Sequence, residues 1–179
     1  TNAAGSDWID NDCDWLGGVQ DQIDAVVLPK AENPDSIEGV ANALRSGRVI
    51  PLLETARGIL AAPEILAARA DIPAVLFGAE GLTAELGIPR TLQGEELLYA
   101  RSRVVLPPAT VGADPIDAVW VKIADAESLR TDAARAKARG FLGKMAIHPD
   151  QVSAINEVFS PSEEEIAAAR RLSSTRAAS

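Results

Sequence analysis

The chain has 179 residues, 47% of them hydrophobic and 4% aromatic, and its formal net charge at pH 7 is −9. That length allows one domain with its own core. The negative charge argues against nucleic acids and anionic membranes as partners, and a small acidic substrate would need a local cation. Cys13 is the single cysteine, so an internal disulfide is excluded and a reducing, cytoplasmic setting is expected. We expect neither a signal peptide nor a membrane span.

Apolar runs and helical spacing predict an alternation of strands and helices along the chain. The expected strands are residues 24–29, 49–54, 73–77, 117–123 and 142–147. The expected helices are residues 34–46, 58–70, 94–106 and 125–139, followed by two terminal helices. Pro34 fits the first turn of the first helix, Gly47 fits its end, and Pro63 indicates a break in the second. The last helix is expected to begin with a capping box from Ser160 to Glu163, and residues 173–179 are expected to fray.

Continuous apolar strands separated by helices indicate an α/β fold with a parallel sheet covered by helices. An open doubly wound sheet and a closed barrel both fit this alternation. Neither a Gly-x-Gly-x-x-Gly fingerprint nor a P-loop occurs in the sequence, which removes the main indication of a nucleotide-binding sheet. Without a linker or low-complexity segment, residues 1–179 are expected to form a single domain that ends in a terminal helix and tail over about residues 160–179.

Polar side chains follow the expected strands at the end where parallel β/α folds gather their functional residues. Lys30 follows the first strand, Glu54 ends the second, Glu80 follows the third and His148 follows the fifth. We therefore expect these four side chains at one rim. Glu54 is the most informative, because a carboxylate after a buried apolar strand needs a partner, a cation or a proton to exchange. Its structural alternative is a bond to a neighbouring backbone group or to Arg57.

Lys30 and the turn after the third strand have structural alternatives as well. Lys30 suits a Schiff base with a carbonyl substrate, but an ion pair with Glu32 or Glu54 is the favoured interpretation. The backbone N–H groups of Gly78 and Ala79 suit an anion, and an ordinary tight turn between strand and helix explains the same residues equally well.

His148 and the acidic residues complete the candidate site. His148 suits a general base or a ligand contact, with its backbone held extended by Pro149, although a hydrogen-bonded scaffold residue is the favoured interpretation. The sequence offers no His/Cys ligand set for structural zinc. A hard cation such as Mg²⁺ would need carboxylates from different strands, and Glu54 and Glu80 are the candidates.

Five segments of the chain resemble the citrate lyase β-subunit-like family, the malyl-, citramalyl- and citryl-CoA lyase branch of the aldolase/citrate lyase barrels. They are LPKAEN (28–33), LLETARGIL (52–60), FGAEGLTAELG (77–87), ARSRVVL (100–106) and GKMAIHPDQVSAINEVFSPSEEEIAAARR (143–171). Their order and spacing are those of the family, and the last is the most specific. The resemblance implies a TIM-type (β/α)8 barrel, here lacking its first strands, that forms a homo-oligomer, commonly a trimer or hexamer.

The resemblance also implies an activity. It is that of a carbon–carbon lyase that splits a 3-hydroxyacyl-CoA such as citryl-, malyl- or citramalyl-CoA into an acyl-CoA and a 2-keto acid. Mg²⁺ is the implied cofactor, holding the keto acid and stabilising the oxygen charge that develops as the bond breaks. The expected site residues are Glu54 and Arg57 for catalysis, Glu54, Gly78, Ala79, Lys30, His148 and Pro149 for substrate binding, and Glu54 and Glu80 for the metal.

The chain departs from the family pattern at several points. Gly81 stands where the family usually has an Asp that is the second metal ligand, and Lys122 occupies an expected strand position that is often acidic. Residues 1–4 resemble the end of the family's third strand, and the chain stops near the family's lid, so a fragment of a longer polypeptide is expected. Two alternatives follow: a catalytically silent member used for binding or assembly, and a 2-keto acid aldolase that does not use CoA.

Overall fold

The fold is built on a parallel sheet of five strands in the order β1-β2-β3-β4-β5. The computed structural model describes residues 1–44 and 48–176. Each strand is added beside the preceding one, as in a β/α barrel, whereas a doubly wound sheet reverses its order at a switch point. The open sheet therefore corresponds to part of a barrel, as the family resemblance implies. The strands are β1 Ala25–Leu28, β2 Arg48–Leu53, β3 Ala74–Phe77, β4 Asp114–Asp117 and β5 Gly143–Lys144.

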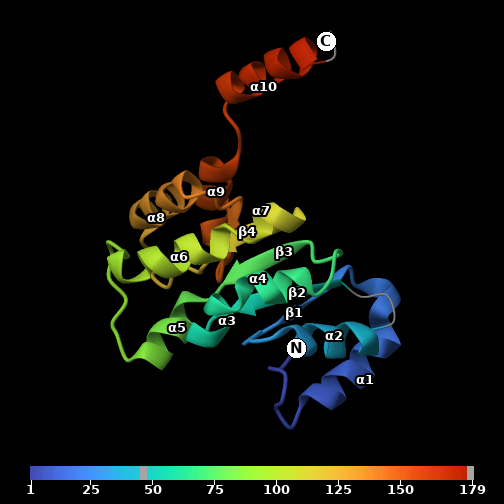
Figure 1. Cartoon of the computed structure of the whole chain (residues 1–179). Helices are drawn as coiled ribbons and strands as arrows, with labels where there is room; N and C mark the ends of the chain where they lie inside the picture. The colour runs from blue at the N-terminus through green and yellow to red at the C-terminus, as the bar shows by residue number, and fades with distance from the viewer. Residues whose placement is uncertain (45–47, 177–179) are drawn as a thin grey trace.

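Helices connect the strands, and Figure 1 shows the last of them, α10, extending away from the rest of the molecule. The helices are α1 Ile9–Val19, α2 Pro34–Ala43, α3 Ala56–Leu60, α4 Ala62–Ala67, α5 Ala79–Leu86, α6 Leu98–Val105, α7 Pro108–Val111, α8 Ala126–Ala138, α9 Pro149–Phe159 and α10 Glu163–Arg176, with 3-10 turns η1 Gln20–Gln22 and η2 Glu95–Leu97. Asn33 caps α2 by accepting a hydrogen bond from Ser36 N, and Pro34 lies in its first turn. The predicted break at Pro63 is confirmed, because α3 ends before it and α4 begins.

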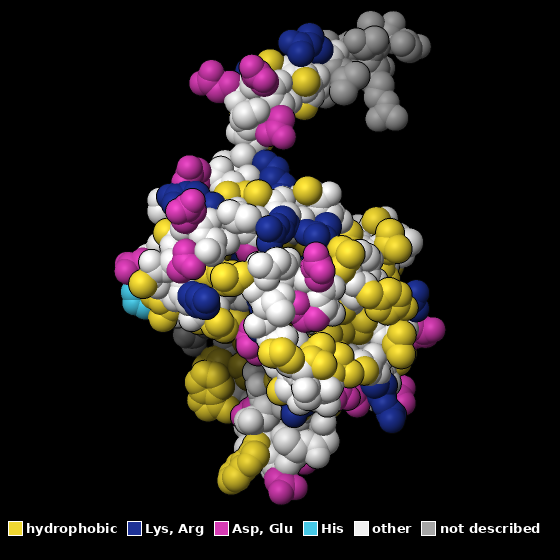
Figure 2. All heavy atoms as spheres, turned by 90° about the vertical axis from the view of Figure 1, so that its left-hand side faces the viewer, with side chains coloured by type: hydrophobic (Ala, Val, Ile, Leu, Met, Phe, Trp, Pro, Cys, Tyr) yellow, Lys and Arg dark blue, Asp and Glu magenta, His cyan; other side chains and the backbone are white. Residues whose placement is uncertain are grey.

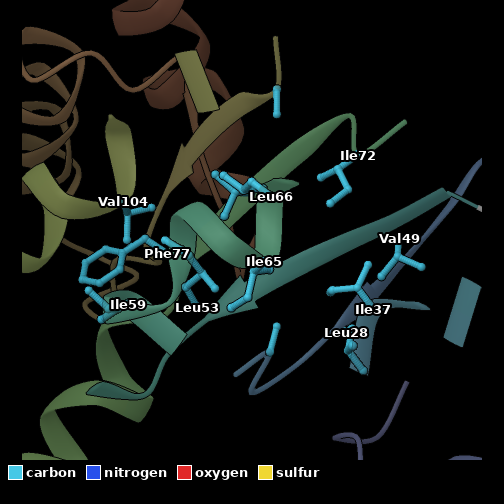
Figure 3. Close-up of a cluster of buried hydrophobic side chains, with 14 of the residues drawn as sticks. Leu28, Ile37, Val49, Leu53, Ile59, Ile65, Leu66, Ile72, Phe77 and Val104 are labelled. Atoms are coloured by element: carbon cyan, nitrogen blue, oxygen red, sulfur yellow. The ribbon is translucent and has the colours of Figure 1, made fainter. Parts of the chain in front are cut away.

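The core lies between one face of the sheet and the helices that cover it. Strand residues alternate in burial, so that Val75 and Phe77 of β3 are buried while the residues between and before them are half-buried. Figure 3 shows Phe77 beside Ile59 of α3 and Val104 of α6. Because successive side chains of a strand point to opposite faces, the helices seal one face of the sheet and leave the other partly open.

Hydrophobic side chains also gather on the outer surface, and Figure 2 shows them over part of one face. Leu60 at the end of α3 and Tyr99 of α6 are 55% and 69% exposed. Exposed apolar groups on neighbouring helices are typical of surfaces that contact another protein. None of the helices in the described part of the chain combines the length and apolarity needed to cross a membrane.

The fourth strand lies earlier in the chain than the sequence predicts. β4 ends at Asp117, and the apolar run predicted as a strand passes beyond the sheet. Asp117 is held in buried ion pairs, and the Trp120 carbonyl accepts a hydrogen bond from the Gln151 side chain. Trp120 therefore packs against α8 and α9 instead of pairing with β3, while Val121 and Ile123 are exposed. The predicted strand position of Lys122 is wrong, because this residue lies in an exposed loop.

Smaller differences occur in the helices and at the fifth strand, which is shorter than predicted. The sequence analysis did not predict α1, α5 or α7. In α1, Ile9, Cys13 and Leu16 pack against the core at helical spacing, a pattern that the sequence contains. The other predicted strands and helices are confirmed with shifts at their ends.

The last helix begins later than predicted. Ser162 N donates to the Glu165 carboxylate and Ser162 Oγ accepts from Glu165 N, so the capping box runs from Ser162 to Glu165 and not from Ser160 to Glu163. Residues 173–176, predicted to fray, belong to α10. The predicted helix end at Ser46 and Gly47, and residues 177–179 of the predicted tail, lie outside the described residues.

Candidate functional site

The carboxyl ends of the five strands lie at one edge of the sheet, because every strand pair is parallel. We call the residues that directly follow these ends the carboxyl rim. Lys30 lies two residues after β1, Glu54 directly after β2 and Gly78 directly after β3. Gly78 N donates to Leu53 O at 2.9 Å, which joins the ends of β2 and β3. Three neighbouring strand ends therefore bring these residues to one stretch of the rim.

Glu54 is half-buried, and within residues 1–44 and 48–176 no hydrogen bond or ion pair engages its carboxylate. Two glycines pack against it. A Cβ atom on Gly78 would overlap Glu54 Cβ, and a Cβ atom on Gly81 would lie 2.7 Å from Glu54 Oε2. The first turn of α5 therefore packs on Glu54 only because these two positions lack side chains. A carboxylate that is partly desolvated and has no protein partner is suited to binding a cation.

The first turn of α5 also places backbone donors beside Glu54. The Gly78 N–H is bonded to Leu53 O, so it is not available to a ligand. The first N–H groups of a helix have no intrahelical acceptor, and in the described part of the chain the Ala79 N–H has no other partner. Of the predicted pair, Ala79 is buried and keeps a donor with no partner among the described residues, and Gly78 contributes the space that admits Glu54.

Glu80 lies in the same turn, but its carboxylate is 2.6 Å from the guanidinium of Arg90. That pairing leaves Glu80 less available to a metal than Glu54. Across residues 1–44 and 48–176, no three His, Cys, Asp or Glu side chains come together in the manner of a metal site. A cation at this stretch of the rim would therefore depend on Glu54 and on oxygen atoms of a ligand.

Lys30 and Arg57 add positive charge to the same stretch. The favoured ion pair of Lys30 with Glu32 or Glu54 is wrong, because Lys30 has no ion pair or hydrogen bond among the described residues. Glu32 instead lies 4.0 Å from Arg57, and both side chains are exposed enough for this contact to be weak. Lys30 also has a φ of +49°, in the left-handed region.

His148 follows β5 and caps α9, with Nδ1 accepting a hydrogen bond from Asp150 N at 3.2 Å. Its backbone is extended before Pro149, as predicted, and the hydrogen bond gives His148 a structural role as the N-cap of α9. Gln151 of α9 adds a second link, because its side chain donates to Trp120 O at 2.7 Å and accepts from Ile147 N at 3.0 Å. The loops after β4 and β5 are thereby fixed to each other.

Sequence analysis missed four charged residues that meet beside the same edge of the sheet. This buried charge cluster consists of Arg101 of α6, Asp117 of β4, Asp132 of α8 and Lys144 of β5. Arg101 donates to both Asp117 carboxylate oxygens at 2.9 Å and to Asp132 at 3.0 Å. Lys144 Nζ lies 2.6 Å from both carboxylates. The two cations and two carboxylates cancel in charge, and all four residues are buried.

The members of the buried charge cluster keep one another ionised. Burial raises the pKa of Asp132, but the charges of Lys144 and Arg101 outweigh burial and lower this pKa overall. Burial lowers the pKa of Arg101, but the neighbouring carboxylates outweigh it and raise this pKa overall. The cluster is thus fully paired and binds α6 and α8 to the ends of β4 and β5.

Residues 1–149 match the model of the HpcH/HpaI aldolase/citrate lyase family. The chain belongs to this family. A citrate lyase subunit beta-like protein of Deinococcus radiodurans is 38% identical over 99% of this chain, and human mitochondrial citramalyl-CoA lyase is 32% identical over 83%. The chain spans 62% of the first relative's length and 49% of the second's.

Two solved structures share its fold. RipC from Yersinia pestis superimposes with a TM-score of 0.86 at 32% identity, covering 92% of this chain and 77% of RipC. CitE from Mycobacterium tuberculosis, in complex with magnesium, acetoacetate and coenzyme A, superimposes with a TM-score of 0.80 at 34% identity, covering 99% of this chain and 66% of CitE. The predicted resemblance and the barrel-type fold are therefore confirmed.

Proposed function

We propose that the protein to which this chain belongs is a lyase that cleaves or forms a carbon–carbon bond in a 3-hydroxyacyl-CoA, with an acyl-CoA and a 2-keto acid as the other reactants. The observation that carries this proposal is the half-buried carboxylate of Glu54, which has no partner in the described part of the chain. Relatives named citramalyl-CoA lyase and L-malyl-CoA/beta-methylmalyl-CoA lyase support the substrate class.

Glu54 would hold the metal of this reaction. Mg²⁺ takes oxygen ligands and is commonly held by one or two carboxylates together with oxygen atoms of a substrate. Glu54 supplies one such carboxylate, and a 2-keto acid has carboxylate and keto oxygens to add. When bound, Mg²⁺ would stabilise the negative charge that develops on oxygen in the transition state. The CitE complexes with magnesium and acetoacetate or oxaloacetate support this role.

Other residues of the rim would bind and orient the substrate. The free Ala79 N–H can donate to the carboxylate of the keto acid. Arg57 and Lys30 would give the rim the local positive charge that an acidic substrate needs on a chain of net charge −9. His148 and Pro149 remain candidates for the CoA side, because they follow β5 at the same edge. Glu80 is the weaker metal candidate because Arg90 engages it.

Assembly and location are further parts of the proposal. The exposed side chains of Leu60 and Tyr99 support a homo-oligomer, for which a trimer or hexamer is the expected size. The cytoplasm is the expected compartment. Residues 1–179 are taken as a single domain that supplies the C-terminal two-thirds of the barrel.

A condensation assay on the full-length protein tests the activity. Acyl-CoA is incubated with glyoxylate, pyruvate or oxaloacetate, with and without Mg²⁺, and loss of free keto acid is followed. Mg²⁺-dependent condensation is expected, and absence of turnover with all three acids would contradict the proposal. Binding of both ligands without turnover would instead favour a catalytically silent member. Turnover that is indifferent to CoA would favour a 2-keto acid aldolase.

Gly81 offers a matched pair of variants that tests the metal role of Glu54. Gly81→Ala and Gly81→Asp place the same Cβ atom near Glu54 Oε2, but only the second adds a carboxylate. We expect Gly81→Asp to bind Mg²⁺ at least tenfold more tightly than Gly81→Ala in calorimetry, because the ion gains a second anionic ligand. Equal affinities would show that position 81 does not face the metal.

A further inference from the structure

Lys30 has a backbone conformation that is unfavourable for a residue with a side chain. Its φ of +49° is the only positive value at a non-glycine residue within residues 1–44 and 48–176. The left-handed region is disfavoured for side chains in general and is most often occupied by Gly, Asn or Asp. Lysine gains nothing from this conformation locally, so the turn after β1 would be formed more easily by glycine or asparagine.

The residues on either side hold the turn in place. Pro29 restricts the backbone before Lys30. Ala31 is fully buried, and its N–H donates to Leu52 O at 3.3 Å. On the other side of Ala31, a Cβ atom on Gly58 would overlap the Ala31 carbonyl oxygen, so the first turn of α3 packs directly on this turn. The surrounding structure therefore imposes the strained conformation on Lys30.

The Lys30 ammonium is exposed and has no protein partner in the described part of the chain. The nearest acid in sequence, Glu32, lies beside Arg57 instead. Ala31 is bonded to Leu52, two residues before Glu54, so the turn that carries Lys30 adjoins the strand end that carries the free carboxylate. A free cation and a free carboxylate at neighbouring strand ends form a pair of sites, one for an anion and one for a cation.

We propose that the strained turn fixes Lys30 so that its ammonium binds an anionic group of the substrate beside Glu54. The proposal rests on the proposed function, because it takes the substrate to be a 2-keto acid and a CoA thioester. The ligand group is a carboxylate of the first or a phosphate of the second. Either can accept up to three hydrogen bonds from the ammonium, and attraction at close range offsets the repulsion expected from a chain of charge −9.

Four variants of the full-length protein separate strain from charge. Lys30→Gly removes both, Lys30→Met removes the charge and keeps a side chain of similar length, and Lys30→Arg keeps both. Lys122→Met is the control, because it removes one exposed lysine from the loop after β4. Thermal unfolding measures the strain. Calorimetry with pyruvate and Mg²⁺, and separately with CoA, measures the binding.

Lys30→Gly is expected to raise the unfolding midpoint by about 2–4 °C, because the left-handed conformation carries no penalty for glycine. Lys30→Gly and Lys30→Met should both lose at least tenfold in affinity for one of the two ligands, while Lys30→Arg and Lys122→Met should not. Loss confined to pyruvate assigns the carboxylate, and loss confined to CoA assigns a phosphate.

Two results would overturn the proposal without touching the proposed function. The first is that wild-type protein binds pyruvate or CoA and that the Lys30→Met variant binds both ligands with the same affinity as wild type. The other is a Lys30→Gly variant with a lower unfolding midpoint than wild type, since the turn would then not be strained. Wild-type protein that binds neither ligand would overturn both proposals together.

Discussion

Two groups of charged residues lie at the same edge of the sheet and differ in burial and in pairing. The buried charge cluster at β4 and β5 is closed to solvent, and each of its charges has at least two partners of opposite sign. At β1 and β2, Lys30 and Glu54 are accessible and have no partner in the described part of the chain. One edge of one sheet thus carries both fully satisfied and unsatisfied charges.

The difference separates a structural role from a binding role. A charge inside a protein is tolerated when oppositely charged groups replace its hydration, and the buried charge cluster meets this requirement internally. Lys30 and Glu54 keep their capacity for a ligand because no side chain of the described residues competes for it. Removing a charge should therefore destabilise the fold in the first group and impair binding in the second.

The largest effect on stability is expected from Lys144→Met. This variant leaves two buried carboxylates facing Arg101 alone, and removing one partner of a buried ion pair costs about 3–5 kcal/mol. Urea unfolding of the full-length protein measures the loss. The control Lys122→Met removes an exposed lysine and should change the unfolding free energy by no more than about 0.5 kcal/mol.

A double variant sharpens the same test. In Lys144→Met/Asp132→Asn one cation and one carboxylate are lost together, so the remaining Arg101 and Asp117 balance each other. We expect the double variant to be more stable than Lys144→Met alone, since the uncompensated buried charge is gone. Similar losses in Lys144→Met and Lys122→Met would show that the cluster does not stabilise the fold.

Lowering the pH is expected to reduce the free energy of unfolding by less than the Lys144→Met substitution does. The folded pKa of Asp132 is lowered, so this carboxyl group stabilises the fold above its unfolded pKa of about 3.9 and loses that contribution as pH falls through the folded value. Each unit of lowering corresponds to about 1.4 kcal/mol. Asp132→Asn should therefore flatten the fall in stability below about pH 4, measured by urea unfolding across the acid range.

Asp14→Asn is the control for the pH experiment, because Asp14 is an exposed carboxylate on α1. Its acid dependence should match that of the wild type. If Asp132→Asn also retains the wild-type slope, the charges of Lys144 and Arg101 do not lower the pKa of Asp132 enough to matter for folding.

The same comparison explains what the sequence could predict. β1 to β3 are short apolar runs with Lys30, Glu54 and Glu80 within three residues of their ends, and in a parallel sheet these ends must share an edge. Glu54 could be identified as a rim residue because its position depends on one strand alone. The strain at Lys30 could not be predicted, since it depends on Leu52 and Gly58 packing around Ala31.

The buried charge cluster was missed for a related reason. Arg101 is 16 residues from Asp117 in the chain, and Lys144 is 27 residues from it. In sequence, a charged residue on an Ala-rich helix is expected to face solvent, and only the folded structure shows that Asp132 faces Arg101 and Lys144. The error in β4 has the same origin. The predicted strand began at Asp117, whereas the observed strand ends there.

The smallest stability effect is expected at Glu54, where the largest effect on function should occur. Glu54→Gln keeps the shape of the side chain against Gly78 and Gly81 and breaks no hydrogen bond or ion pair in the described part of the chain. The unfolding free energy should therefore change by no more than about 0.5 kcal/mol. Mg²⁺ binding in the presence of pyruvate should nevertheless fall at least tenfold, because a neutral amide replaces the anionic ligand. A matched change at Glu80, which Arg90 already engages, should leave Mg²⁺ affinity close to that of the wild type. If Glu54→Gln destabilised the fold as much as Lys144→Met, Glu54 would be a structural charge, and the division of this edge into a satisfied and an unsatisfied half would not hold.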